Sequence, residues 1–281
     1  MKICKTIDEM RATSRAARHA GKRLGLVPTM GALHEGHLSL VRAAKVKCDA
    51  VAASIFVNPL QFGPTEDLAK YPRSFDPDVQ LLEKESVDIL FAPAPDEMYP
   101  PGAVTYVTVE GLSDKLCGKS RPGHFRGVAT VVAKLFHIVE PDLAFFGQKD
   151  AAQCTVIRRM VRDLNLPIEI AVCPIVREPD GLAMSSRNVY LSPQDRKSAT
   201  VLNRSLTEVK QRFDQGERSA TALIKAAKKV LAQEPTVRLD YFEIVDPSTL
   251  DPAPKLTGPA LVAVAAVVGT TRLIDNLLLQ G

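Results

Sequence analysis

The sequence predicts an α/β protein with a doubly wound parallel sheet and a smaller C-terminal α+β domain. Three observations support this prediction. Short apolar segments alternate with amphipathic helical patterns over the first 176 residues, the alternation ends there, and the last third finishes in strands joined by a tight turn. We therefore expect a Rossmann-like domain over residues 1–176, and a lid-like domain of helices and a short antiparallel sheet over residues 177–281.

The first domain should begin with a helix that runs to about Ala20, because Thr6 and Glu9 have the spacing of a capping box. Apolar strands and helices then follow one another, and strand–helix–strand order at this spacing implies parallel strands with right-handed crossovers. The strands are expected at 24–28, 50–57, 88–91, 143–146 and 168–173, and the helices at 36–47, 76–85, 127–139 and 151–164. Residues 104–109 alternate in polarity, which predicts an exposed or edge strand.

The C-terminal part should contain two helices and three strands. Ser192 followed by Pro193 is a typical helix start and predicts one long helix to about Phe213. A second helix is expected over 221–233, and strands are expected near 239–245, 261–268 and 272–278. Gly269 and Thr270 separate the last two strands, and this short connection predicts a hairpin.

Composition excludes several classes of protein. Apolar residues make up 46% of the 281 residues, as in globular proteins, and the net charge of +4 is too small, and its basic residues too scattered, for a nucleic-acid partner. The five cysteines show no C-x-x-C spacing, which indicates reduced thiols in a reducing compartment. Neither a signal peptide nor an apolar run of membrane-spanning length is visible, so we expect a cytoplasmic protein without a membrane partner.

The sharpest local signal is the segment PTMGALHEGH from Pro28 to His37, which joins a predicted strand to a predicted helix. A helix N-terminus offers free amides and a positive dipole end, both suited to phosphate. His34 and His37 share a helix face and could donate hydrogen bonds to phosphate oxygens. Histidines here can also be ordinary capping or core residues, but the glycine-containing turn favours a nucleotide. A zinc protease would need the second histidine one residue later.

Two further segments fit phosphate binding. Gly147–Asp150 follows a predicted strand, Lys149 could reach phosphate oxygens as a point charge, and Gln153 lies one turn further on. Met184–Asn188 places hydroxyls beside a guanidinium between the two predicted domains, where a hinge could close on a triphosphate. Taken alone, Gly147–Asp150 would rather be a polar strand-to-helix loop, and Met184–Asn188 is a weak signal because serine and arginine are common in linkers.

Other polar segments leave more than one interpretation open. Asn58 and Gln61 follow a predicted strand, and their amides suit the hydroxyl and carboxylate of a hydroxy acid. Residues 121–127 hold two arginines and two glycines before a helix, which fits an anion site and a surface turn equally well. Asp76 and Asp78 are expected to cap a helix, so no protein ligands for a metal are predicted.

Together, and in this order, these segments resemble the pantothenate synthetase family of the HxGH nucleotidyltransferase superfamily. The matching segments are His34–His37, Asn58–Phe62, Glu66–Asp67, Tyr71–Arg73, Arg121–Phe125, Gly147–Asp150, Met184–Asn188 and Arg272–Asn276. The resemblance covers nearly the whole chain. Where family members often have two glutamines after the Lys-Asp pair, this chain has Ala152 and Gln153. The second position is the one expected to contact pantoate, and Gln153 occupies it; the alanine replaces only its neighbour.

The resemblance implies a reaction in which ATP and pantoate form a pantoyl adenylate and pyrophosphate. The amine of β-alanine then attacks the adenylate to give pantothenate and AMP. Mg²⁺ is expected to arrive with the ATP phosphates, and the family is usually a homodimer that pairs through the larger domain.

The resemblance also implies the roles of individual residues. The implied ATP contacts are Met30, Gly31, Ala32, Leu33, His34, Glu35, Gly36, His37, Gly147, Gln148, Lys149, Asp150, Val176, Met184, Ser185, Ser186 and Arg187. Gln61, Gln153 and Asn58 are implied to bind substrate, and Gln61 also borders β-alanine. His37 is implied to be the proton donor. The other implied catalytic residues are His34, Lys149, Ser185, Ser186 and Arg187.

Three rival functions make different predictions. A nucleotidyltransferase that acts on a phosphorylated cofactor precursor would use the same two histidines but would need more basic residues for its second substrate. A tRNA-charging enzyme or RNA-binding module would carry a basic stripe in its C-terminal part, and none is visible. A scaffold role would leave three phosphate-type loops at strand ends unexplained.

Overall fold

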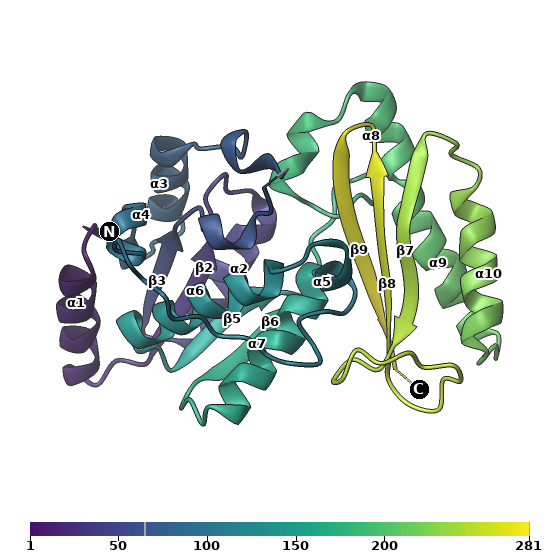
Figure 1. The fold of residues 1–281 in the computed structure, drawn as a ribbon. Helices are drawn as coiled ribbons and strands as arrows, with labels where there is room; N and C mark the ends of the chain where they lie inside the picture. Colours follow the sequence, from purple (N-terminus) through teal and green to yellow (C-terminus); the bar gives the residue numbers. More distant parts are fainter. Residues whose placement is uncertain (65, 281) are drawn as a thin grey trace.

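The computed structural model describes residues 1–64 and 66–280, so the last residue of the predicted second domain lies outside the described part. A six-stranded sheet and a three-stranded sheet lie side by side (Figure 1). The strand order of the large sheet is β1-β4-β3-β2-β5-β6, and the neighbouring strands run parallel. Its strands are β1 Lys2–Cys4, β2 Leu24–Thr29, β3 Ala50–Ile55, β4 Ile89–Phe91, β5 Leu143–Gly147 and β6 Glu169–Cys173. The predicted fold class is confirmed.

Helices cover both faces of the large sheet, which is why its central strands are almost wholly apolar. Leu26 of β2 packs into the core formed with α1 Ile7–His19, α6 His124–Val139 and α7 Ala151–Asp163. Val27, the next residue, faces the opposite core, formed with α2 Glu35–Lys47 and α3 Phe75–Lys84. The predicted capping box is present at Thr6 and Glu9, where α1 begins.

The chain reverses its direction across the sheet between β2 and β5. From β2 it proceeds through β3 to β4 on one side, and β5 and β6 are then added on the other side. Ligands of open α/β sheets bind at such a switch point, beside the carboxyl ends of the strands. The segments that follow β2, β3 and β5 contain most of the predicted site residues.

The smaller sheet has the antiparallel order β7-β8-β9, formed by β7 Val237–Val245, β8 Ala260–Val268 and β9 Thr271–Leu279. The predicted hairpin is confirmed by the pairing of Val268 with Thr271. Helices α9 Val201–Asp214 and α10 Ala220–Leu231 cover its outer face (Figure 1).

The single long helix predicted after Ser192 is wrong, because it is divided into α8 Pro193–Ala199 and α9. At the break, the Thr200 hydroxyl donates to the Lys197 carbonyl at 2.8 Å. Such side-chain bonds to the backbone compete with the helical ladder.

The strand predicted at residues 104–109 is also wrong. Within residues 1–64 and 66–280 this segment pairs with no strand, and the Val107 amide donates instead to the Thr130 hydroxyl at 3.0 Å. Polarity alternation indicates how side chains face, but a strand also needs a neighbouring backbone with which to form hydrogen bonds.

The sequence prediction missed β1 and the short helices α4 Pro95–Met98 and α5 Cys117–Ser120, which are too brief to give a periodic pattern. It also missed the 3₁₀ turns η1 Pro59–Gln61, η2 Asp67–Ala69, η3 Gln148–Asp150 and η4 Ser186–Tyr190.

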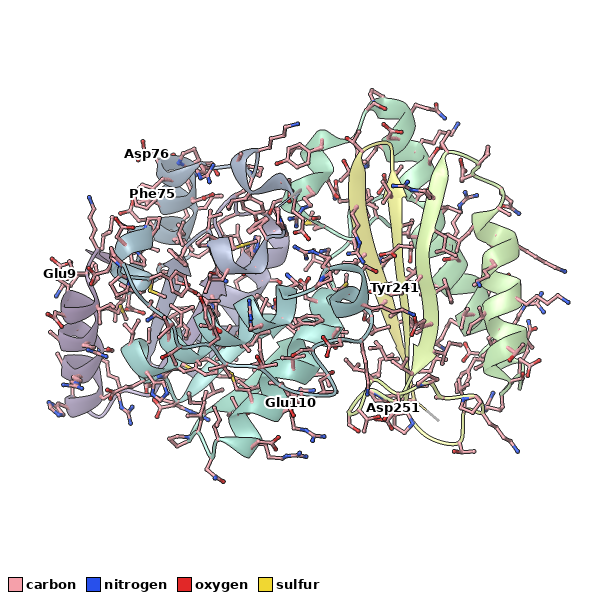
Figure 2. All side chains as sticks on the ribbon, viewed as in Figure 1. Glu9, Phe75, Asp76, Glu110, Tyr241 and Asp251 are labelled. Atoms are coloured by element: carbon pink, nitrogen blue, oxygen red, sulfur yellow. The ribbon has the colours of Figure 1, made fainter. Side chains whose placement is uncertain are left out.

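Side-chain contacts join the two units at α5 and the segment before it. The Cys117 sulfur lies 3.1 Å from the Tyr241 hydroxyl, and Lys115 pairs with Asp251 at 2.7 Å. Figure 2 labels Tyr241 and Asp251 where the two units meet. The described cysteines form no disulfide, and no helix in the described part of the chain is long and apolar enough to span a membrane.

Candidate active site

A continuous cleft lies at the switch point and extends between the two sheets. It consists of an inner cavity of about 230 Å³ at the ends of β2, β3 and β5, and an outer cavity of about 960 Å³ that faces β9. Seven residues, Lys149 and Arg187 among them, line both parts. His34 and His37 line the inner part alone.

The structure brings most of the predicted site residues to the inner cavity. Those that line it are Met30, His34, Gly36, His37, Asn58, Gln61, Gly147, Lys149, Asp150, Gln153, Val176, Ser185, Ser186 and Arg187.

The other six predicted residues belong to its surroundings. Glu35 forms an ion pair with Arg42, and the Met184 amide donates to the Val176 carbonyl at 3.0 Å. Gln148 bonds to Asn276 in the C-terminal sheet. Gly31, Ala32 and Leu33 form the turn between β2 and α2.

His34 and His37 stand together at the start of α2, with ring centroids 4.1 Å apart. The Nδ1 atom of His34 accepts from the Gly36 amide at 3.1 Å, and the Nδ1 atom of His37 accepts from the His34 amide at 3.3 Å. Since Nδ1 is an acceptor in both rings, the proton of each neutral imidazole lies on Nε2. The pair therefore caps its own helix and keeps two N–H donors for the cavity.

The electrostatics of the cleft keep both imidazoles neutral at pH 7. Burial, followed by the charge of Lys149, lowers the pKa of His34 to about 4. Burial, the neighbouring His34 and Lys149 lower the pKa of His37 to about 3. Both effects disfavour a positive charge on the ring, so these histidines act as neutral hydrogen-bond donors before a ligand enters.

A buried carboxylate holds the turn that precedes the histidines. Asp78 is 2% exposed, and its two oxygens accept the amides of Ala32 and Leu33, each at 2.8 Å. The backbone there is left-handed, with φ of 83° at Gly31 and 51° at Ala32. A β-carbon at Gly31 would lie 3.0 Å from the carboxylate, which explains why glycine occupies this position. Asp78 thus anchors the turn, and the prediction that it caps α3 is wrong.

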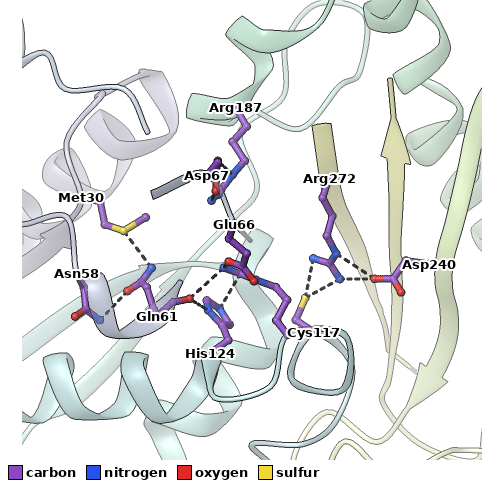
Figure 3. Close-up of polar contacts among 11 residues, drawn as sticks. Met30, Asn58, Gln61, Glu66, Asp67, Cys117, His124, Arg187, Asp240 and Arg272 are labelled. Atoms are coloured by element: carbon purple, nitrogen blue, oxygen red, sulfur yellow. Dashed lines mark hydrogen bonds and ion pairs between the residues drawn. The ribbon is translucent and has the colours of Figure 1, made fainter. Parts of the chain in front are cut away.

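A hydrogen-bond chain orients Gln61, which lies between Asn58 and Met30 in Figure 3. Asn58, 1% exposed, donates from Nδ2 to the Gln61 Oε1 at 3.1 Å and accepts the Tyr99 hydroxyl at 2.9 Å. The Gln61 Nε2 then lies 3.1 Å from the Met30 sulfur, a weak acceptor. Gln61 therefore has N–H donors available for a better acceptor, such as a carboxylate.

Arg187 and Arg121 of the cleft are paired with acidic residues of one loop, and Figure 3 shows the first pair, Arg187 with Asp67. Arg187 binds Asp67 through two contacts of 2.8 and 2.9 Å, and Arg121 binds Glu66 at 2.9 Å. Although burial alone would raise it, the pairing with Arg187 holds the pKa of Asp67 below its usual value. Lys149, in contrast, forms no ion pair within residues 1–64 and 66–280. Its charge is therefore available to a ligand.

The sequence prediction missed the residues that form hydrogen bonds to the site residues and to the turns that carry them. Tyr99 and Asn276 were not singled out as site residues, and Asp78 was assigned to a helix cap. These contacts join segments far apart in the chain, so no local spacing signals them.

Comparison with known proteins identifies the family of this chain. The sequence profile described as "Pantoate-beta-alanine ligase" matches residues 2–278. A pantothenate synthetase of Koribacter versatilis is 59% identical over 280 residues, which is 100% of this chain and 96% of the relative. The pantothenate synthetase structure from Thermus thermophilus has a TM-score of 0.94 and 48% identity, and the match covers 99% of both chains.

A second solved structure is a pantoate-beta-alanine ligase from Francisella tularensis, complexed with "Beta-gamma ATP" and beta-alanine. It has a TM-score of 0.81 and 34% identity, and the match covers 99% of this chain and 97% of the relative. With a cleft at the switch point and matches along its whole length, the chain belongs to the pantoate–β-alanine ligase family and is an enzyme with pantothenate synthetase activity.

Proposed function

We propose that this enzyme activates pantoate as a pantoyl adenylate in the inner cavity and then transfers the pantoyl group to β-alanine. The observation that carries this proposal is the convergence of an imidazole pair, Lys149 and an oriented glutamine on one cleft. The first step forms a bond between a pantoate carboxylate oxygen and the α-phosphorus of ATP, and releases pyrophosphate. The second step forms the amide bond and releases AMP.

MgATP is proposed to bind along the segment 30–37, the turn 147–150, Val176 and the segment 184–187. The amides at the start of α2 and the Nε2–H groups of His34 and His37 would face the phosphates. Lys149 would add a positive charge, since it has no carboxylate partner among the described residues. Donors fixed before the reaction stabilise charge that builds on the phosphate oxygens in the transition state.

This arrangement gives His37 a specific proposed role. Its low pKa means that it donates a hydrogen bond as a neutral ring in the free enzyme. Bound phosphates would raise that pKa by bringing negative charge to the ring. His37 could then also release a proton to a phosphate oxygen, which is the donor role that the family resemblance implies.

Pantoate is proposed to lie between Gln61 and Gln153. Asn58 fixes the orientation of Gln61, so that its N–H groups address the pantoate carboxylate or hydroxyl. β-Alanine, which the Francisella tularensis enzyme holds together with its ATP ligand, would border Gln61. Holding the adenylate and the amine side by side provides most of the advantage in the second step.

Arg187, Ser185 and Ser186 are proposed to close on the triphosphate, which would displace Asp67 from Arg187. In this view residues 1–176 form the nucleotide- and pantoate-binding domain, and the chain from residue 177 onward acts as its lid. We also propose a homodimer in the cytoplasm. The exposed apolar side chains of Val104 and Tyr106, 82% and 46% exposed on the larger unit, support such a contact.

Isotope exchange between ATP and pyrophosphate tests the first step. With Mg²⁺ and pantoate but no β-alanine, we expect exchange that depends on pantoate and falls by about 100- to 1,000-fold in His37→Ala. His137→Ala is the matched control, because His137 is exposed on α6 and lies outside the lining of either cavity. Absence of exchange in well-folded protein would contradict the adenylate and favour a nucleotidyltransferase.

A further inference from the structure

Two polar residues of β9 are buried against the turn that carries Lys149. Asp275 and Asn276 are 3% and 4% exposed. Buried polar groups need hydrogen-bond partners, and the side chains of both residues have partners outside β9. Their partners lie in the large sheet's Gln148–Lys149 turn and in the segment that links the two units.

The side chain of Asn276 binds this turn through three hydrogen bonds. Its Nδ2 donates to the carbonyls of Gln148 and Lys149, each at 2.9 Å, and its Oδ1 accepts from the Gln148 Nε2 at 3.0 Å. Both donors and the acceptor of the amide are used. A reversed amide would place its oxygen against two carbonyl oxygens, so one orientation is fixed.

Asn276 is itself held by an ion pair whose carboxylate, Asp275, is buried. The backbone amide of Asn276 donates to Asp275 Oδ1 at 2.8 Å, and Arg177 binds both Asp275 oxygens at 2.7 and 3.0 Å. Arg177 also donates to the Gly181 carbonyl at 3.0 Å. A chain of hydrogen bonds therefore connects the segment before Ser185 to β9, and β9 to the turn that carries Lys149.

The turn needs this external support. Gln148–Asp150 is a three-residue 3₁₀ turn, and Gly147 at its cap position has no side chain that could bond to the turn. The ammonium group of lysine lies at the end of a long flexible side chain. A shift of the backbone at Lys149 would therefore shift the region that its ammonium can reach. Misplacement of a charge by about 1 Å at a reacting phosphate can lower a rate by about 100-fold.

We propose that Asn276 is a positioning residue for Lys149, through which the C-terminal sheet takes part in the phosphate chemistry without touching the substrates. The inference rests on the proposed function of Lys149 as the cation that faces the phosphates. Asp275 and Arg177 form the anchor of Asn276. The smaller sheet is in this respect part of the active site's framework, in addition to its role as a lid.

A double-mutant cycle tests this inference in the pantoate-dependent exchange of pyrophosphate with ATP. We expect Asn276→Ala to lower the exchange rate by about 10- to 100-fold, and Lys149→Ala to lower it at least as much. In the Lys149→Ala background, Asn276→Ala should cost less than about 3-fold, because the group that it positions is already missing. The Asn276→Ser variant keeps one hydrogen-bond donor, so its exchange rate should lie between those of the unmodified enzyme and Asn276→Ala. It replaces Asn276→Ala in the cycle if that variant does not fold.

The control and the contradicting results are distinct. Ser205→Ala removes a buried hydroxyl that donates to the Leu202 carbonyl at 2.6 Å on α9, and it should leave the exchange rate unchanged. Multiplicative losses in the double variant, or an unchanged rate in Asn276→Ala, would overturn the positioning role. An unchanged rate in Lys149→Ala would instead refute the proposed role of Lys149 itself.

Discussion

Replacing Asp78 with asparagine should loosen the turn that leads into the two histidines. The carboxylate accepts the amides of Ala32 and Leu33, both at 2.8 Å, in a buried site. Asparagine has nearly the same shape, but its single oxygen can replace only one of these acceptors. Its NH₂ group would face the other amide as a second donor. One buried backbone amide therefore loses its partner.

The expected loss follows from these contacts. A hydrogen bond to a charged group contributes about 1.5–3 kcal/mol, and an unpaired buried amide costs about 1–3 kcal/mol. The change therefore costs about 2 kcal/mol, which corresponds to a factor of about 30 in an equilibrium constant. Ala32 is held in a left-handed conformation with φ of 51°, so the turn will relax once the anchor is weakened.

Isothermal titration with a non-hydrolysable ATP analogue and Mg²⁺ measures this effect. We expect Asp78→Asn to raise the Kd by about 10- to 30-fold, while the Kd of pantoate changes little. Ser74→Ala is the matched control, because it removes only the hydroxyl that lies 3.2 Å from the same carboxylate and leaves both amide bonds in place. Unchanged nucleotide affinity and thermal stability in Asp78→Asn would refute the reasoning.

Two further predictions concern the glutamine and the histidines. Tyr99→Phe removes the hydroxyl that donates to Asn58, the residue that orients Gln61. The KM for pantoate should therefore rise by about 5- to 10-fold, with little change in the KM for ATP. Equal changes in both KM values would argue against an orienting role. The free energy of unfolding should fall as the pH drops from about 6.5 toward 4, because the folded state holds His34 and His37 neutral while the unfolded chain binds protons at their ordinary pKa. Denaturant titrations should show a shallower fall in His37→Gln, and an identical pH dependence would contradict the assigned burial.

Much of the fold could be predicted because its signals are local. The capping box at Thr6, the apolar segments of β2 and β3, and the hairpin at Gly269 each depend on a few neighbouring residues. The break at Thr200, where the hydroxyl bonds to the Lys197 carbonyl, has no equivalent signal in the apolar spacing of the sequence. The unpaired segment 104–109 has the pattern of a strand but finds no neighbouring strand among the described residues.

The site could be predicted where its residues follow strand ends, because the carboxyl ends of parallel strands share one edge of the sheet. This places His37, Gln61 and Lys149 in one cleft. The roles assigned to them came from the family resemblance. The supporting residues could not be found in this way, since Asn276 lies 127 residues from the Lys149 carbonyl that it binds.

Oxygen transfer from pantoate to AMP tests the central claim most directly. Pantoate labelled with ¹⁸O in both carboxylate oxygens would be incubated with the enzyme, MgATP and β-alanine, and the products analysed by mass spectrometry. A pantoyl adenylate predicts one ¹⁸O atom in the phosphoryl group of AMP and the other in the new amide carbonyl. AMP without label, or label in inorganic phosphate formed together with ADP, would contradict activation at the α-phosphorus.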